Sequence, residues 1–105
     1  MRLSLRRKRP HPDEVEARKW VSEQIDRLRA LRYDDLLEQL DEPEHYTIRS
    51  RTGRELMGET QVFWDSREDG DLRVLVDVCE PKPGVVSSIV SDDFIRARDG
   101  SFVGE

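Results

Sequence analysis

The residues that could perform nucleophilic or acid–base chemistry are few in this chain of 105 residues. It contains one cysteine, Cys79, and two histidines, His11 and His45. A nucleophilic cysteine needs a lowered pKa and a base nearby, and His45 is the base that the sequence offers. No known signature surrounds Cys79, and strand alternation places it on the face of the strand that the row of valines does not occupy. We therefore interpret Cys79 as a structural or idle thiol.

Metal chemistry is also poorly supported by the residue types. A site of cysteine and histidine ligands would have to gather Cys79, His11 and His45 from distant positions. The acidic loop 65–71 is similar to the start of a calcium loop, which needs oxygen ligands at its first, third and fifth positions and a glutamate at its twelfth. Arg67 and Val76 occupy the third and twelfth positions. We interpret the loop as a turn and expect no metal and no cofactor.

Two pairs of neighbouring carboxylates, Asp34–Asp35 and Asp92–Asp93, invite an acid–base interpretation. Adjacent residues point about 100° apart on a helix and to opposite faces on a strand. Adjacency in the sequence therefore does not create a catalytic pair. We interpret the first pair as charge at a helix start and the second as a turn or cap.

Glu55 and Glu59 would share a strand face that Gln61 continues, unless a bulge at Gly58 breaks the row. Such a row is usually the solvated side of a half-buried sheet, although it could bind a cation or a basic peptide. Phosphate-binding glycine loops and the common hydrolase motifs are absent from the sequence. The sequence thus predicts no catalytic, cofactor-binding or metal-binding residue and favours a protein that is not an enzyme.

Helical periodicity dominates the first half of the chain. Apolar residues recur every three or four positions, which predicts a helix over 12–30; they are Ala17, Trp20, Val21, Ile25, Leu28 and Leu31. A second stripe contains Tyr33, Leu36, Leu37 and Leu40. Its centre is rotated by about 130° from the first, at 100° per residue. One straight helix cannot direct both stripes to one core, so we expect a break near Leu31–Arg32 and a short helix over 33–40.

The periodicity changes to two from Tyr46 onward, which predicts strands. We expect three strands, over 45–51, 54–65 and 72–79, with a turn at Thr52-Gly53 and a hairpin signal at Asp69-Gly70. Gly58 suggests a bulge within the second strand.

The last quarter of the chain is harder to assign. We expect an irregular connection over 81–84, and either a strand or a buried loop over Val85–Ser91. Asp99-Gly100 predicts a tight hairpin that joins 94–98 to 101–104.

These segments define an α+β fold. Short loops between strands allow only antiparallel neighbours, so the broken N-terminal helix should pack on one face of an antiparallel sheet of about four to five strands. The order of elements resembles the cystatin-like layout, and this resemblance implies no function. We expect a basic flexible arm over 1–10 and a single domain over 11–105.

Charge is distributed unevenly along the chain. The net charge is −5, and five of the positive charges lie in the first nine residues, so the rest of the chain carries −10. A body of that sign repels phosphate backbones and favours basic partners. The positive residues of the arm are Arg2, Arg6, Arg7, Lys8 and Arg9. We expect the arm to be solvated or to neutralise the acidic body.

The composition of the chain suggests its cellular compartment and the type of organism that it comes from. No apolar run is long enough to span a membrane, and no secretory signal follows the basic arm. A lone cysteine cannot form the disulfides that small secreted domains need. Arginine outnumbers lysine fifteen to three. We therefore expect a cytoplasmic and bacterial protein without membrane contact.

Our leading hypothesis is a non-catalytic domain that binds another protein, either a basic partner or a second copy of itself. Phe63 and Leu75 would mark a contact patch on the sheet face away from the helix. One alternative is a small-ligand-binding or enzymatic domain with a pocket between helix and sheet, to which Thr60 or Tyr46 could contribute. Another alternative, which we do not favour, is nucleic-acid binding through the arm. Trp20 and Trp64 fit core positions, or else anchors of an interface.

Overall fold

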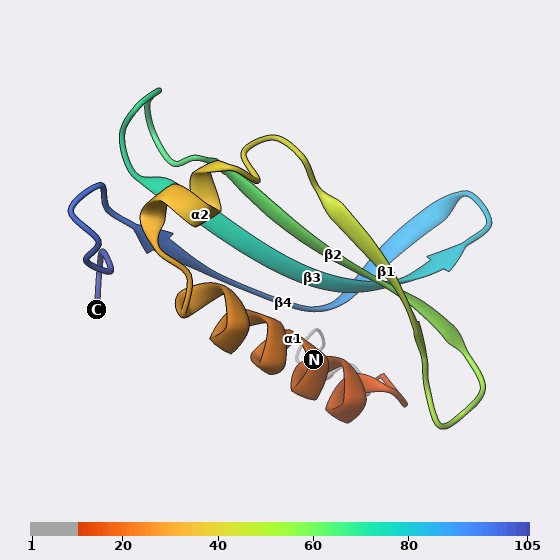
Figure 1. Cartoon of the computed structure of the whole chain (residues 1–105). Helices are drawn as coiled ribbons and strands as arrows, with labels where there is room; N and C mark the ends of the chain where they lie inside the picture. The colour runs from red at the N-terminus through yellow and green to blue at the C-terminus, as the bar shows by residue number, and fades with distance from the viewer. Residues whose placement is uncertain (1–10) are drawn as a thin grey trace, which may run out of the picture.

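The computed structural model describes residues 11–105, which form one helical layer on a four-stranded antiparallel sheet (Figure 1). The predicted α+β class is confirmed. The sheet is a meander in the order β1-β2-β3-β4. The elements in chain order are α1 (Glu14–Arg29), α2 (Tyr33–Leu37), β1 (Glu44–Arg49), β2 (Glu55–Trp64), β3 (Leu72–Lys82) and β4 (Val85–Arg96). No helix among residues 11–105 has the length and apolarity required to cross a membrane.

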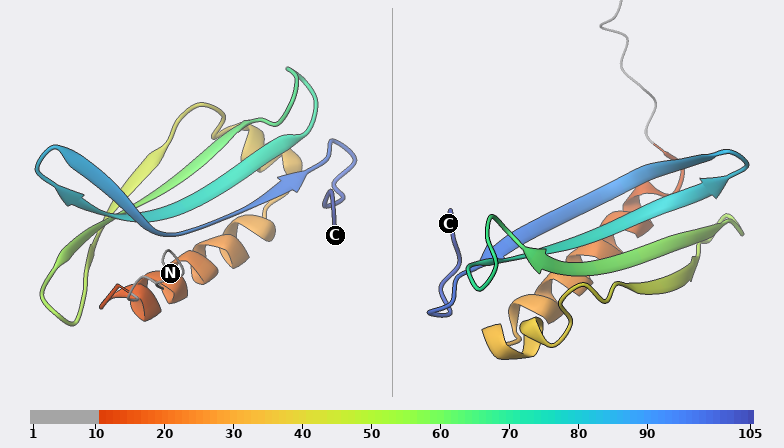
Figure 2. Two further views of the ribbon diagram at one scale, coloured as in Figure 1. Left: turned by 180° about the vertical axis from the view of Figure 1, so that it is seen from behind. Right: turned by 90° about the horizontal axis from the view of Figure 1, so that it is seen from above.

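The long helix α1 lies across one face of the sheet and leaves the other face uncovered by residues 11–105 (Figure 2). Its buried residues are Ala17, Val21, Ile25 and Leu28, which belong to the predicted stripe. Glu14 and Glu16 in its first turn, and Arg27 and Arg29 in its last, complement the helix dipole. The helix faces a row of valines and leucine on the central strand β3, namely Leu72, Val74, Val76 and Val78.

The predicted break between the helices is present at residues 30–32. The second helix is shorter than expected, since α2 ends at Leu37. Two tighter turns follow, in which Gln39 and Leu40 donate their N–H groups to Leu36 and Leu37. The chain then joins the sheet, where the N–H of Asp41 donates to the carbonyl of Val62 at 2.9 Å. Attachment to β2 therefore replaces the last helical turn.

The expected bulge at Gly58 is wrong. β2 pairs without interruption through Gly58 with both β1 and β3. Gly58 faces α1, where the ring of Trp20 lies directly over its backbone. The irregularity in the sheet lies elsewhere, between Val78 and Cys79 in the pairing of β3 with β4.

The uncertain segment Val85–Ser91 is a strand and forms the first part of β4. The irregular connection expected over 81–84 is therefore wrong, because β3 continues to Lys82 and a hairpin turns at Pro83-Gly84. Pro81 is tolerated within β3 because β2 pairs with β3 only as far as Cys79.

The C-terminal hairpin is only partly as expected. Residues 94–96 belong to β4, and the returning segment makes a single bridge, between Arg96 and Phe102. The turn itself forms at the predicted residues, where the N–H of Ala97 donates to the carbonyl of Ser101. The turn predicted at Thr52-Gly53 is confirmed, and the hairpin predicted from Asp69-Gly70 is present between β2 and β3, which the loop 65–71 joins.

Candidate protein-binding surface

The residues that could perform nucleophilic chemistry are not arranged for it. Cys79 is buried, and its burial, together with the charges of Asp77 and Glu59, raises the pKa of its thiol. A raised pKa lowers the thiolate fraction that a nucleophile requires. His45, the candidate base, instead lies with its Nε2 atom 3.1 Å from a carboxylate oxygen of Glu59. Among residues 11–105 no three histidine, cysteine or acidic side chains gather to hold a metal ion.

The carboxylate pairs make local structural contacts. Asp35 accepts a hydrogen bond from the backbone N–H of Arg32 at the start of α2. Asp93 forms an ion pair with Arg73, and its own N–H donates to Asp92 at 2.8 Å. These contacts belong to the start of α2 and to the surface of the sheet.

The acidic residues of β2 likewise contact neighbouring side chains. Glu55 pairs with Arg49 across the first hairpin at 3.3 Å, and Glu59 lies beside His45. In the loop 65–71, Asp65 pairs with Arg73 at 2.8 Å. These side chains contact one another at the surface of the sheet.

The residues proposed for an internal pocket, Thr60 and Tyr46, pack against neighbouring residues. Thr60 is buried on β2, and Tyr46 stacks edge-on against Trp20 with their ring centroids 5.4 Å apart. Trp20 and Trp64 are both partly buried against the core. A groove of about 450 Å³ lies beside α1. It is lined by Val15, Trp20 and Ile48 together with charged side chains.

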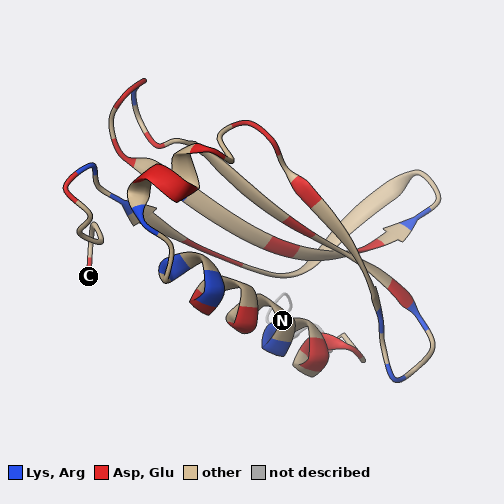
Figure 3. Cartoon of the chain, in the orientation of Figure 1, with Lys and Arg blue, Asp and Glu red and all other residues tan. Residues whose placement is uncertain are grey.

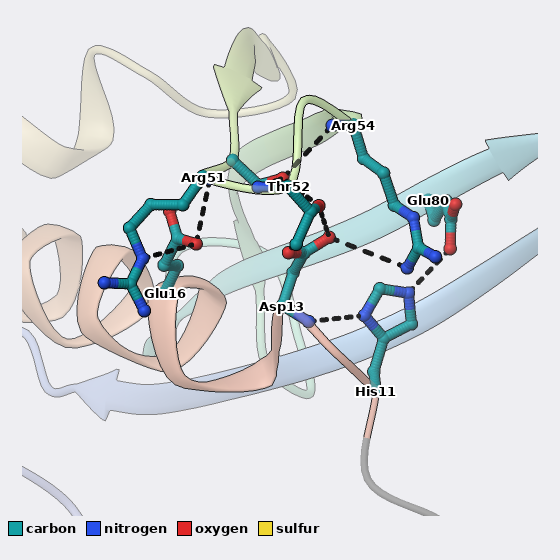
Figure 4. Close-up of polar contacts among 8 residues, drawn as sticks. His11, Asp13, Glu16, Arg51, Thr52, Arg54 and Glu80 are labelled. Carbon is teal, nitrogen blue, oxygen red and sulfur yellow. Dashed lines mark hydrogen bonds and ion pairs between the residues drawn. The ribbon is translucent and has the colours of Figure 1, made fainter.

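A polar cluster, which we call the latch, joins the start of α1 to both hairpins (Figure 4). It consists of His11, Asp13, Glu16, Arg51, Thr52, Arg54 and Glu80. The two hairpins diverge beyond the Met57–Cys79 pair, where the pairing of β2 with β3 ends. Asp13 is buried there and accepts a hydrogen bond from the hydroxyl of Thr52 at 3.0 Å. Glu16 accepts a hydrogen bond from the backbone N–H of Arg51 at 3.0 Å. The latch therefore ties the helix start to the turn between β1 and β2.

The other half of the latch reaches the second hairpin. The N–H of Asp13 donates to Nδ1 of His11 at 3.0 Å, which leaves the ring proton on Nε2. That Nε2 donates to Glu80 on β3 at 2.6 Å. Within the described part of the chain no buried polar side-chain atom lacks a partner. The latch is thus a satisfied structural network, and its residues lie too far apart in the sequence to be recognised there.

The face of the sheet that α1 does not cover, which we call the open face, contains an apolar patch. Alternation along the strands places Phe63, Leu75 and Ile95 on this face, all half-buried. Arg73 lies between them, because it pairs with Phe63 on one side and Ile95 on the other. The sequence predicted this position for Phe63 and Leu75, and the register adds Ile95.

An acidic pole lies at the end of the sheet next to this patch (Figure 3). It consists of residues 32–44, around α2, and the loop 65–71, which contain ten acidic residues and two arginines, a net charge of −8. The two segments touch, since the hydroxyl of Tyr33 donates to the carbonyl of Gly70 at 2.7 Å. Burial, and then the charges of Asp69, Asp71 and Asp34, raise the pKa of Tyr33 against the effect of Arg98. The pole carries more negative charge than the whole chain.

The opposite end of the molecule carries charges of both signs. Arg51, Arg54 and Lys82 lie at or near the tips of the two hairpins, with Arg49 close by on β1. Blue and red segments are mixed at this end (Figure 3), because Glu16, Asp13 and Glu55 pair with Arg51, Arg54 and Arg49. The excess of acidic over basic residues is therefore concentrated at the acidic pole, beside the apolar patch.

Comparisons with protein-family models, with curated proteins and with solved structures found no match to this chain.

Proposed function

We propose that this chain is a non-catalytic domain that binds a basic segment of another protein on its open face, beside the acidic pole. The observation that carries this proposal is the position of the apolar patch of Phe63, Leu75 and Ile95 directly next to the loop 65–71. Asp65 begins that loop and holds Arg73, which lies within the patch. Protein interfaces commonly combine an apolar centre with a charged rim.

The chemistry of the partner follows from the charge of the pole. A net charge of −8 on two touching segments attracts a basic sequence and speeds its encounter. Apolar side chains between the basic residues would contact Phe63 and Leu75. We further propose a cytoplasmic, bacterial protein, which the lone Cys79 and the high arginine content support.

The test uses a synthetic peptide that alternates arginine and leucine, titrated into the isotopically labelled full chain while amide signals are followed by NMR. We expect saturable shifts at residues 63–75 and at Ile95. Leu75→Lys should weaken binding by about tenfold or more, because it places a charge in the apolar patch. Val15→Lys is the control, since Val15 is 81% exposed on the helix and far from the open face.

Two further measurements test the proposed site. A peptide that alternates glutamate and leucine should not bind, because it meets the acidic pole with like charge. Shifts spread over the whole surface, or equal loss of binding in Leu75→Lys and Val15→Lys, would refute the proposed site. Affinity capture from a cell lysate with the same three proteins would then identify the natural partner.

A further inference from the structure

The free edges of the sheet are protected very unequally. The outer strand β1 is only six residues long and carries Glu44, His45 and Arg49. The part of β3 that β2 does not reach consists of Glu80, Pro81 and Lys82. Charges, prolines and short length are the devices by which sheets avoid pairing with other chains. Both of these edges therefore resist the addition of a strand.

The outer edge of β4 lacks this protection. The strand is twelve residues long, and its first seven residues, Val85–Ser91, contain neither a charge nor a proline. Between Val85 and Phe94, no other segment of residues 11–105 pairs with this edge. Val85 and Val86 are 58% and 72% exposed, among the most exposed large apolar residues of the described chain. An uncharged segment rich in β-branched residues on a free edge is well suited to pairing.

We propose that β4 pairs in antiparallel orientation with β4 of a second copy of this chain, joining the two sheets into one of eight strands. When β4 pairs with β4 of a second copy about a two-fold axis, the free edge of each copy gains hydrogen-bond partners. The uncharged segment Val85–Ser91 is the part that can face itself without opposing like charges. This interface is separate from the open face, so it adds to the proposed function and does not depend on it.

Charge at the two ends of the segment fixes the orientation and favours a second copy as the occupant. Lys82 lies beside Val85 at the start of β4, whereas Asp92 and Asp93 follow the uncharged segment. Antiparallel pairing brings the Lys82 end of each copy towards the two aspartates of the other. Parallel pairing would instead place aspartates beside aspartates. The contact runs over Val85–Ser91, and its first residues lie on the hairpin that projects from the sheet (Figure 2).

The test is sedimentation analysis of the full chain over a wide range of concentrations, for the wild type, Val86→Lys and Val15→Lys. We expect the wild type to reach twice the mass of one chain. Val86→Lys should weaken this association by about tenfold or more, because it brings a lysine of each copy to the shared edge. Val15→Lys is matched in residue type and exposure and should dimerise like the wild type. Circular dichroism should show that both variants are folded.

Hydrogen exchange supplies a second measurement on the same samples. The amides of residues 85–88 should exchange more slowly in concentrated than in dilute wild-type protein, and equally fast at both concentrations in Val86→Lys. The mass of one chain at every concentration would overturn the proposal. So would a dimer that Leu75→Lys dissociates and Val86→Lys does not, or growth into open-ended aggregates. Peptide binding at the open face is measured separately, so the two proposals can fail independently.

Discussion

Trp20 and Gly58 are matched to each other across the interface between α1 and the sheet. A Cβ atom built on Gly58 would lie 2.5 Å from Cη2 of Trp20 and within 2.9 Å of two further ring atoms. The absence of a side chain at position 58 is what lets the indole ring reach the backbone of β2. The same ring also packs against Tyr46 of β1. This one contact joins the helix to the half of the sheet that α1 covers least.

Gly58→Ala should destabilise the fold by about 1–3 kcal/mol, because the added methyl group must displace a packed ring. Denaturant unfolding followed by fluorescence measures the change in the free energy of unfolding. The double variant with Trp20→Leu should recover part of the loss, since leucine leaves room for the methyl group. Strictly additive effects of the two substitutions would show that the ring does not constrain position 58.

Asp13, which is buried, and Thr52 should show a coupling free energy of about 1 kcal/mol in a double-mutant cycle. Thr52 donates to Asp13 inside the latch, where the carboxylate is shielded from water. Asp13→Ala and Thr52→Val are the single variants, and thermal unfolding provides the free energies. Glu14→Ala is the neighbouring control and should cost less than about 0.5 kcal/mol, because its ion pair with Arg18 is at the surface.

Arg96→Lys should destabilise the protein by about 1–3 kcal/mol. The guanidinium of Arg96 donates to the carbonyls of Arg29, Leu31 and Gly100, at 3.1, 2.8 and 2.8 Å. It therefore holds the end of α1 against the C-terminal turn, and a lysine cannot reproduce this forked geometry.

Chemical denaturation should separate Arg96→Lys from Arg98→Lys. Arg98 is exposed and makes a single bond, to the carbonyl of Asp69. Equal stability of the two variants would contradict the role given to Arg96. Loss of helical circular dichroism at lower denaturant concentration in Arg96→Lys would support it.

The contact between His11 and Glu80 should make stability depend on acid pH. The hydrogen bond from His11 lowers the pKa of the Glu80 carboxyl in the folded chain. A lowered pKa means that the contribution is fully present above the pKa of glutamate in the unfolded chain and is lost as pH falls through the folded value. Glu80→Gln should therefore be less stable than the wild type at neutral pH, and the difference should vanish in acid. Urea unfolding across this pH range measures it, and a difference independent of pH would refute the pairing.

Local sequence patterns were sufficient to predict the class of fold. The helical stripe that ends at Leu28, and the second stripe that contains Leu36, point in different directions on one helix. The chain therefore had to break between them, as it does. The alternation from Leu72 to Val78 can bury one face only in a strand. These predictions succeeded because the periodicity of side chains follows directly from backbone geometry.

The predictions that failed concern residues whose roles depend on distant neighbours. A glycine in a strand permits a bulge or the close approach of another group, and only the position of Trp20 shows which applies at Gly58. Pro81 argues against a strand until it is known that β2 no longer pairs with β3 beyond Cys79. The latch brings Asp13 within a hydrogen bond of a residue 39 positions away, a proximity that no local pattern encodes.

The sequence by itself determined the helical and extended segments, the net negative charge and the scarcity of nucleophiles, because these depend on residue type and spacing alone. The tertiary structure decided that acids from residues 32–44 and 65–71 meet at one end, that Ile95 joins Phe63 and Leu75, and that the uncharged part of β4 forms a free edge. Each of these relationships joins residues far apart in the chain, and their distance is set by strand register and helix packing.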